Sequence, residues 1–334
     1  MGTALTSPLF EGSERRNGES YLDYMVRLFE HKKEYGLVCD DIAALLNAQT
    51  GNNYTECTYR KYYAAFNDGR LYERKDVARR PARTILCLSD FHYPYAVPVE
   101  IFQEYQRPDI LLLNGDLVDM QSISKFPKAY RVSPMDEIVG GRQYLIDLIS
   151  ILSPGQVIIN KGNHEVRFGN YLSRSIDGEL KDLMPETALD LIVNDGFHHY
   201  DKRGRAKIWY QPIRDVFEDI EITYTGEWWC KIGNTIFAHP LAYSGGILKT
   251  SEKAANHFLR VDPNFDALVL AHTHKLGMYR EGNITLFEQG CCCLTGKLNY
   301  ADGKLSMPQQ QGFLYLCQEQ DGSLMFDQTK LVTL

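Results

Sequence analysis

The middle of the chain alternates short apolar runs with longer segments of helical spacing. The apolar runs are TILCLS (84–89), DILLLN (109–114) and QVIIN (156–160), and the helical segment Met135–Leu152 precedes the last of them. Runs of this length without polar alternation are typical of strands buried on both faces, as in a parallel sheet covered by helices. This region therefore predicts parallel strands joined by helical crossovers.

Antiparallel pairing is indicated further along the chain. The segment WWCKIGNTIFAH (228–239) contains a Gly–Asn turn between two apolar runs, and NITLFEQ (283–289) and GFLYLCQ (312–318) follow. Parallel strands first and antiparallel strands later predict an α/β fold, built as a four-layer α/β/β/α sandwich of two mixed sheets with a small N-terminal all-helical module.

Polar motifs stand at or beside the ends of five predicted strands. Carboxyl ends of strands are where ligands gather in open α/β sheets. The chain has nine histidines, and five of them lie in these motifs. The motifs are Asp90-Phe91-His92, Gly115-Asp116-Leu117-Val118-Asp119, Gly162-Asn163-His164-Glu165, His239 and His272-Thr273-His274.

Each motif alone has a plainer interpretation. A single Asp-x-His is more often a cap or a hydrogen-bonded pair than a metal site, and Gly-Asn-His can form a simple turn. Five coincidences in one order explain the pattern poorly, so the set predicts a metal site. Carboxylate, imidazole and amide oxygen suit manganese, iron or zinc, and the motifs contain no cysteine. We expect two divalent ions, because a pair of metal ions can clamp a phosphate between them. Manganese is the first choice, and iron, zinc or nickel are the alternatives.

The order of these motifs resembles that of the calcineurin-like metallophosphoesterases, over residues 84 to about 280. The resemblance implies a metal-dependent hydrolase of phosphate esters. It implies that Asp90, His92 and His274 ligate the first metal, that Asn163, His239 and His272 ligate the second, and that Asp116 bridges the two. It also implies that His164 protonates the leaving oxygen while Asp119 orients its ring, roles that suit an imidazole with a carboxylate partner.

Three positions depart from the family pattern. Pro240 and Ala271 stand where glycine usually flanks the last two motifs. Met120 occupies the position of an arginine in protein Ser/Thr phosphatases, which weakens the assignment to that group.

Arg167 lies one turn into the helix predicted after His164. Its guanidinium could meet a substrate phosphate. A surface ion pair with Glu165 or Asp177 is an equally weighted alternative.

The first part of the chain is expected to fold separately from the rest. Apolar residues at helical spacing predict three short helices, over residues 20–36, 40–48 and 55–66, with the outline of a helix-turn-helix unit. A charged linker is expected over Arg70–Arg83. The predicted divisions are a disordered tail (1–18), the helical module (19–80) and the metallophosphoesterase domain (81–334).

The segment from Arg60 to Arg83 is basic, with eight cationic and three acidic residues and interleaved tyrosines. This composition favours contact with the phosphate backbone of DNA. The alternative is a helical cap whose aromatic residues pack on the enzyme and whose charges are solvated. The motif order also resembles calcineurin-like proteins common in phage and prophage genomes. The candidate nucleic-acid contacts are Arg60, Lys61, Arg70, Arg74 and Lys75.

Net charge, cysteine content and apolar runs limit where the protein can act and what it can bind. The net charge of −7 argues against a protein that coats nucleic acid through its overall field. Eight scattered cysteines without a CxxC pair predict reduced thiols in a cytoplasmic protein. Cys291, Cys292 and Cys293 are consecutive, and on an extended chain they cannot form one compact cluster. No apolar run is long enough for a membrane span.

The function predicted from the sequence is phosphoester hydrolysis by a dinuclear metal centre, acting on DNA as a phosphodiesterase or nuclease. The alternatives are a nucleotide or cyclic-nucleotide phosphodiesterase, a small-molecule or protein phosphatase, and a non-catalytic DNA-binding regulator. The sequence leaves the oligomeric state open.

Overall fold

The computed structural model describes residues 12–334 except 79, 126–131, 182, 201–203, 205–206, 245, 247 and 298–308, with the backbone alone at 70–78 and 175. The chain divides into two compact units, Met1–Arg80 and Pro81–Leu334. Most of the predicted disordered tail, residues 1–11, lies outside the described residues. Within the described part of the chain, no helix is long and apolar enough to cross a membrane.

The first unit consists of three helices, α1 (Tyr21–Glu30), α2 (Cys39–Thr50) and α3 (Glu56–Ala78). The three helices share a core that contains Leu28, Ile42, Leu46 and Tyr59. Tyr63 also serves this core, since its ring stacks on Phe29 with centroids 4.7 Å apart. Tyr59, which directly precedes the basic segment, and Tyr63 within it therefore pack inside the module itself.

The predicted charged linker over Arg70–Arg83 is wrong for most of its length, because α3 continues to Ala78. Gly69 lies three residues beyond the predicted end of this helix, but an interior glycine costs only about 1 kcal/mol relative to alanine. The residues after it, RLYERKDVA, are mainly good helix formers that outweigh this cost.

Residues 12–18, placed in the mobile tail by composition, are held against α1. The Arg27 side chain donates to the backbone carbonyls of Gly12 and Glu14, at 2.9 and 2.8 Å. It also forms a largely buried ion pair with Glu19, with an N–O distance of 2.7 Å. Short-range composition contains no signal for these contacts, because the arginine that makes them lies 13 to 15 residues away.

The second unit contains two mixed sheets, as predicted. The order of strands is β13-β12-β1-β2-β3-β6 in the first sheet and β10-β11-β9-β8-β7 in the second, and β4 and β5 form a separate hairpin. The strands are β1 (Arg83–Leu88), β2 (Ile110–Asn114), β3 (Gln156–Asn160), β4 (Phe197–Tyr200), β5 (Lys207–Tyr210), β6 (Glu221–Tyr224), β7 (Trp229–Ile232), β8 (Thr235–Ala238), β9 (Ala267–Leu270), β10 (Leu276–Glu281), β11 (Ile284–Gln289), β12 (Gly312–Gln318) and β13 (Lys330–Thr333).

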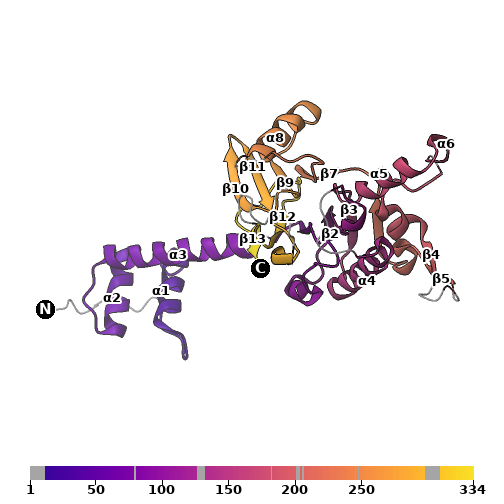
Figure 1. Ribbon diagram of the computed structural model, residues 1–334. Coiled ribbons are helices and arrows are strands. Elements are labelled where there is room, and N and C mark those ends of the chain that lie inside the picture. Colours follow the sequence, from indigo (N-terminus) through magenta and orange to yellow (C-terminus); the bar gives the residue numbers. More distant parts are fainter. Residues whose placement is uncertain are drawn as a thin grey trace. The chain divides into compact units, whose positions relative to one another are not determined.

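Helices of this unit connect and cover the sheets (Figure 1). The α-helices are α4 (Pro134–Leu152), α5 (Val166–Ser175), α6 (Gly178–Lys181), α7 (Ile213–Val216) and α8 (Lys249–Val261). Short 3-10 turns lie at Val99–Tyr105, Gln121–Ile123 and Thr295–Lys297, and a π-helical turn at Asp190–Asp195.

Alternating side chains of the strands build the predicted four layers. On β1, Ile85 and Cys87 face the second sheet and share a core with Phe237 of β8. Leu86 and Leu88, on the other face of β1, share a core with residues of α4. On the far side of the second sheet, α8 packs its own apolar residues against β8 and β9. The order of layers is therefore helix, sheet, sheet, helix, which confirms the predicted sandwich.

Candidate metal centre

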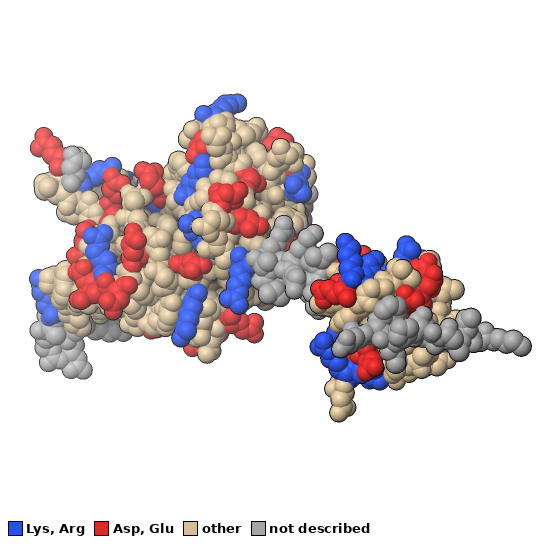
Figure 2. All heavy atoms as spheres, turned by 180° about the vertical axis from the view of Figure 1, so that it is seen from behind, with Lys and Arg blue, Asp and Glu red and all other residues tan. Residues whose placement is uncertain are grey.

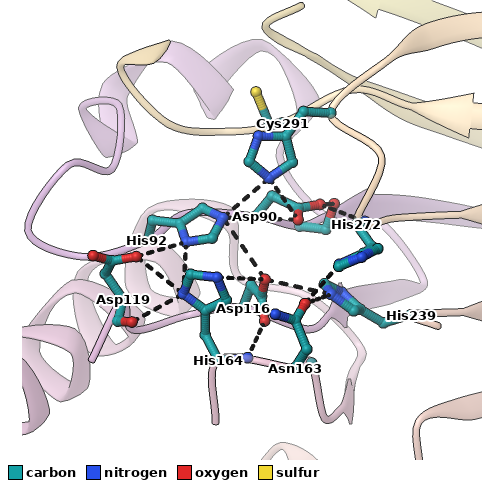
Figure 3. Close-up of polar contacts among 12 residues, drawn as sticks. Asp90, His92, Asp116, Asp119, Asn163, His164, His239, His272 and Cys291 are labelled. Carbon is teal, nitrogen blue, oxygen red and sulfur yellow. Dashed lines mark hydrogen bonds and ion pairs between the residues drawn. The ribbon is translucent and has the colours of Figure 1, made fainter. Parts of the chain in front are cut away.

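The polar motifs of both sheets lie close together, at the carboxyl ends of their parallel strands. The strands β1, β2 and β3 are parallel neighbours in the first sheet, and β8 and β9 are parallel neighbours in the second. Parallel strands end on the same edge, so the residues that follow them meet where the two edges meet. Figure 3 shows side chains from all five motifs pointing toward one another.

The loops that carry these side chains turn sharply. Five non-glycine residues of the motifs have positive φ, a backbone conformation that costs of order 1 kcal/mol or more each and persists only where its surroundings enforce it. These residues are Asp90 (φ 54°), His92 (48°), Asp116 (57°), His272 (73°) and His274 (52°).

The first group of ligand atoms comes from Asp90, His92 and His274, all buried. His274 Nε2 lies 3.1 Å from Asp90 Oδ1 and 3.1 Å from His92 Nε2. Two donors that each bind one ion at about 2.1 Å lie roughly 3 Å apart, so these separations suit a shared cation.

The second group comes from Asp116, Asn163, His239 and His272. Asn163 Oδ1 lies 3.1 Å from His239 Nε2 and 2.6 Å from His272 Nδ1. Asp116 Oδ2 lies 3.4 Å from His239 Nε2 and 3.7 Å from His92 Nε2. The Asp116 carboxylate therefore stands between the two groups, in the position that a bridging ligand requires.

The electrostatics of the centre favour added positive charge. Burial alone would lower the pKa of His239, but the Asp116 and Asp90 carboxylates raise it to about 10. The pKa of His274 is raised to about 9, since Asp90 outweighs the effect of burial. Among the described residues, His272 Nε2 is buried and makes no hydrogen bond. Divalent cations fit such a site, because they would replace the protons that the carboxylates otherwise attract.

His164 and Asp119 form a pair beside these groups. His164 Nδ1 lies 3.0 Å from Asp119 Oδ1 and 2.9 Å from the Asp119 carbonyl oxygen. Arg167 donates to the same carbonyl at 2.7 Å, and its Nη2 lies 2.8 Å from His164 Nε2. The guanidinium of Arg167 thus contacts the His164 ring at the edge of the centre.

Glu165 has a positioning role that the sequence analysis did not assign. Its carboxylate accepts backbone N–H groups of Asp116 at 3.0 Å, Leu117 at 2.6 Å and Gly162 at 2.8 Å. These bonds tie the loop after β2 to the loop after β3. The sequence did contain a signal for this role, since Glu165 is the last residue of the Gly-Asn-His-Glu motif.

The two sheets are also joined beneath the centre by buried amides. The Asn160 side chain donates to Asn114 Oδ1 at 2.9 Å, and the Asn114 side chain donates to Gln289 Oε1 at 3.1 Å. His239 Nδ1 lies 2.7 Å from the Asn114 carbonyl oxygen, which orients that ring. The sequence signal was present, since the runs of β2 and β3 both end in asparagine.

The three departures from the family pattern leave the centre intact. His239, before Pro240, and His272, after Ala271, both still reach Asn163. Met120 is buried with φ of 51°, and its backbone N–H is bound by the Glu137 carboxylate.

The candidate nucleic-acid residues lie on α3 in the other unit. Arg60 and Lys61 are exposed, and Arg60 forms an ion pair with Glu56 at 3.3 Å. The side chains of Arg70, Arg74 and Lys75 lie outside the described residues.

A pocket of about 480 Å³ opens beside the centre. Asn163, from the second ligand group, lines it together with Arg167, Tyr171 and Arg174 on one face of α5. Lys125, from the segment after β2, also lines it. The pocket therefore carries three cationic side chains.

The backbone at Gly162 passes close to the Asp116 carboxylate. A Cβ at this position would lie 2.1 Å from Asp116 Oδ1 and 2.5 Å from Asp116 N. We expect Gly162→Ala to displace the bridging carboxylate, to lower metal content, and to destabilise the fold by roughly 1–3 kcal/mol. Elemental analysis and chemical denaturation measure both effects. Gly178→Ala is the matched control, because a Cβ there meets nothing within 4 Å; full metal content in Gly162→Ala would contradict the proposed centre.

Two family models match the chain. Residues 11–78 match the YonJ N-terminal domain, and residues 83–276 match the calcineurin-like phosphoesterase family. No curated protein shows significant similarity to the chain.

Solved structures similar to this chain share little sequence with it. An archaeal phosphodiesterase is 14% identical, with 75% of this chain and 99% of that chain covered and a TM-score of 0.35. Zinc-bound Vps29 from Entamoeba histolytica is 15% identical, with coverages of 75% and 98% and a TM-score of 0.35. Vacuolar protein sorting 29 from Cryptosporidium parvum is 14% identical, with coverages of 76% and 99% and a TM-score of 0.33.

The match to residues 83–276 covers more than half of the 334-residue chain. It includes all five motifs, whose side chains the fold gathers into clusters able to hold metal ions. The chain belongs to the calcineurin-like phosphoesterase family and is a metal-dependent hydrolase.

Proposed function

We propose that the enzyme hydrolyses phosphodiester bonds in DNA at a dinuclear manganese centre. The observation that carries this proposal is the placement of the two ligand groups around Asp116, with the His164–Asp119 pair on one side and a cationic pocket beside them. Asp90, His92 and His274 would hold the first ion, Asn163, His239 and His272 the second, and Asp116 would bridge them.

Two divalent ions held in this way would supply charge neutralisation for the phosphate and would lower the pKa of a water molecule. The oxygen- and nitrogen-rich donor set suits manganese. The positive-φ backbone and the Glu165 hydrogen bonds hold these donors in place, so the protein itself supplies a preorganised site.

His164 would deliver a proton to the leaving oxygen. Its Nδ1 is engaged by Asp119, so Nε2 is the atom that would carry the proton to the leaving oxygen. In the structure Nε2 lies 2.8 Å from the Arg167 guanidinium, which must turn to the substrate phosphate before Nε2 can hold that proton. Nε2 lies 3.8 Å from Asp116 Oδ2, at the edge of the ligand groups. Arg167 stands beside the same nitrogen and would bind a phosphate oxygen there, as a guanidinium can do with two parallel hydrogen bonds.

The pocket supports a diester over a monoester. A volume of about 480 Å³ lies in the range of sites that enclose a small ligand, so it has room for a group beyond the scissile phosphate. Arg167 and Arg174 are two turns apart on α5 with the exposed ring of Tyr171 between them, a pattern that suits further phosphates and a stacked base.

DNA is favoured by local charge. The chain carries a net charge of −7, and the face drawn in Figure 2 mixes acidic and basic side chains, so attraction must come from particular segments. The basic segment from Arg60 to Arg83 supplies one, and the exposed side chains of Arg60 and Lys61 belong to it. The eight free cysteines suit a reducing compartment, and we place the enzyme in the cytoplasm.

Replacing His164 tests the proposed acid. We expect His164→Ala to retain its metal and to lose about 10²–10⁴-fold in kcat on a dinucleotide, whose leaving alkoxide needs a proton. The loss should be much smaller on bis(p-nitrophenyl) phosphate, because nitrophenolate leaves without one. The exposed His257 provides the matched His→Ala control. Equal losses on both substrates, or no loss with metal retained, would count against this role.

Replacing Arg174 tests the pocket. We expect Arg174→Gln to raise KM for DNA about tenfold, since a charge-assisted contact contributes about 1.4 kcal/mol or more. The rate on bis(p-nitrophenyl) phosphate should stay unchanged because that substrate is short. Arg260→Gln, at another exposed arginine, on α8, is the control. An unchanged KM for DNA would show that the substrate does not occupy the pocket.

Removing the first unit tests the basic segment. A chain that begins at Pro81 should bind DNA more weakly and with a shallower dependence on salt, since fewer counterions are released. Its rate on bis(p-nitrophenyl) phosphate should equal that of the full chain. Identical salt slopes would make the helical module a cap. Turnover of cyclic nucleotides with DNA left intact by both chains would instead establish the nucleotide phosphodiesterase alternative.

A further inference from the structure

Two cysteines lie next to the first ligand group, on a strand end that none of the five motifs includes. Cys291, Cys292 and Cys293 directly follow β11 and Gly290, and all three are fully buried. As expected for extended backbone, their side chains alternate. Cys292 joins the large core under α4, whereas Cys291 and Cys293 form a separate small cluster with Tyr95. Of the three consecutive cysteines, only Cys291 and Cys293 therefore lie on the same side of the strand end. Figure 3 shows Cys291 at the margin of the metal centre.

The pair is close enough to His274 to share an ion with it. One ligand atom each from His274, Cys291 and Cys293 lie within 4.8 Å of one another, and all three residues are buried. Two sulfur atoms bound to one zinc ion at about 2.3 Å each lie roughly 3.8 Å apart. The observed group therefore needs only small side-chain adjustments to close on an ion.

His274 has a ring nitrogen, Nδ1, that is available to bind an ion. Its Nε2 faces Asp90 and His92 in the first ligand group. Its Nδ1 is buried and, among the described residues, makes no hydrogen bond. A ligating histidine normally has its second nitrogen held by an acceptor, so an unpaired Nδ1 on a ring that lies beside two thiols is unusual.

We propose that His274 Nδ1, Cys291 Sγ and Cys293 Sγ form a third metal site that takes a soft, thiophilic ion such as Zn²⁺, Cu⁺ or Cd²⁺. Two thiolates and one imidazole select such ions, whereas the oxygen-rich centre next to them suits manganese. Binding releases the two thiol protons and the Nδ1 proton, and the Cys291 thiol gives up the hydrogen bond that it donates to the Gln310 carbonyl at 3.3 Å.

The new site shares one side chain with the hydrolytic centre. His274 would bridge the two sites through its two nitrogens, so the affinity of each site must depend on occupancy of the other. The inference rests on the thiol pair and on His274 as a ligand, and it is independent of the substrate proposed above.

X-ray absorption on the wild-type chain tests the site without any substitution. The hydrolytic centre is first filled with Mn²⁺, and one equivalent of Zn²⁺ is then added. We expect the zinc edge to report two sulfur neighbours at about 2.3 Å together with nitrogen. A zinc environment of nitrogen and oxygen alone would overturn the proposal.

Cysteine variants locate the site. Cys291→Ser and Cys293→Ser should each lose the ultraviolet absorption that cadmium–thiolate bonds produce when Cd²⁺ is added to the manganese-loaded chain. Cys292→Ser is the matched control, because this neighbour is equally buried but faces the other core. Loss of the absorption in all three variants alike, or in none, would show that the thiol pair does not hold the ion.

Discussion

The meeting of two sheets at their carboxyl edges is the constraint on which the rest of the structure depends. Buried amides hold that junction, from Asn160 through Asn114 to Gln289, and Gln289 continues to Ser89 at 2.9 Å beside the first ligand group. Each unpaired buried amide would cost of order 1–3 kcal/mol, so the network forms as a whole or not at all. It sets the distance between sheets and thereby the distance between the two ligand groups.

Forming the metal centre without its ions costs free energy, through strained backbone and buried charged groups. Five motif residues hold positive φ, and several carboxylates and imidazoles are buried side by side. The carboxylates attract protons onto His239 and His274, and divalent ions would supply that positive charge instead. Metal binding thus offsets both the desolvation of the carboxylates and the strain of the loops, which links stability to metal occupancy.

The ligand groups and the proposed substrate pocket come from different parts of the fold. The ligand groups come from strand ends, where backbone geometry is rigid. The cationic pocket comes from one face of α5 and from the segment after β2. The thiol pair comes from the end of β11 and approaches the centre from a third direction. A rigid hydrolytic centre can therefore be combined with pocket contacts that vary independently of it, whereas the thiol pair stays coupled to it through His274.

The sequence by itself determined the sandwich, its strand runs and the residues that converge, because apolar runs followed by polar motifs place those motifs at strand ends. It did not determine the length of α3, since Gly69 is a weak local signal that the following helix formers outweigh. It left Glu165 and Asn114 without roles, and it could not bring Cys291 to His274 or shape the pocket on α5. Only the tertiary structure decided these, because each depends on side chains meeting across loops, strands or sheets whose relative placement no local pattern encodes.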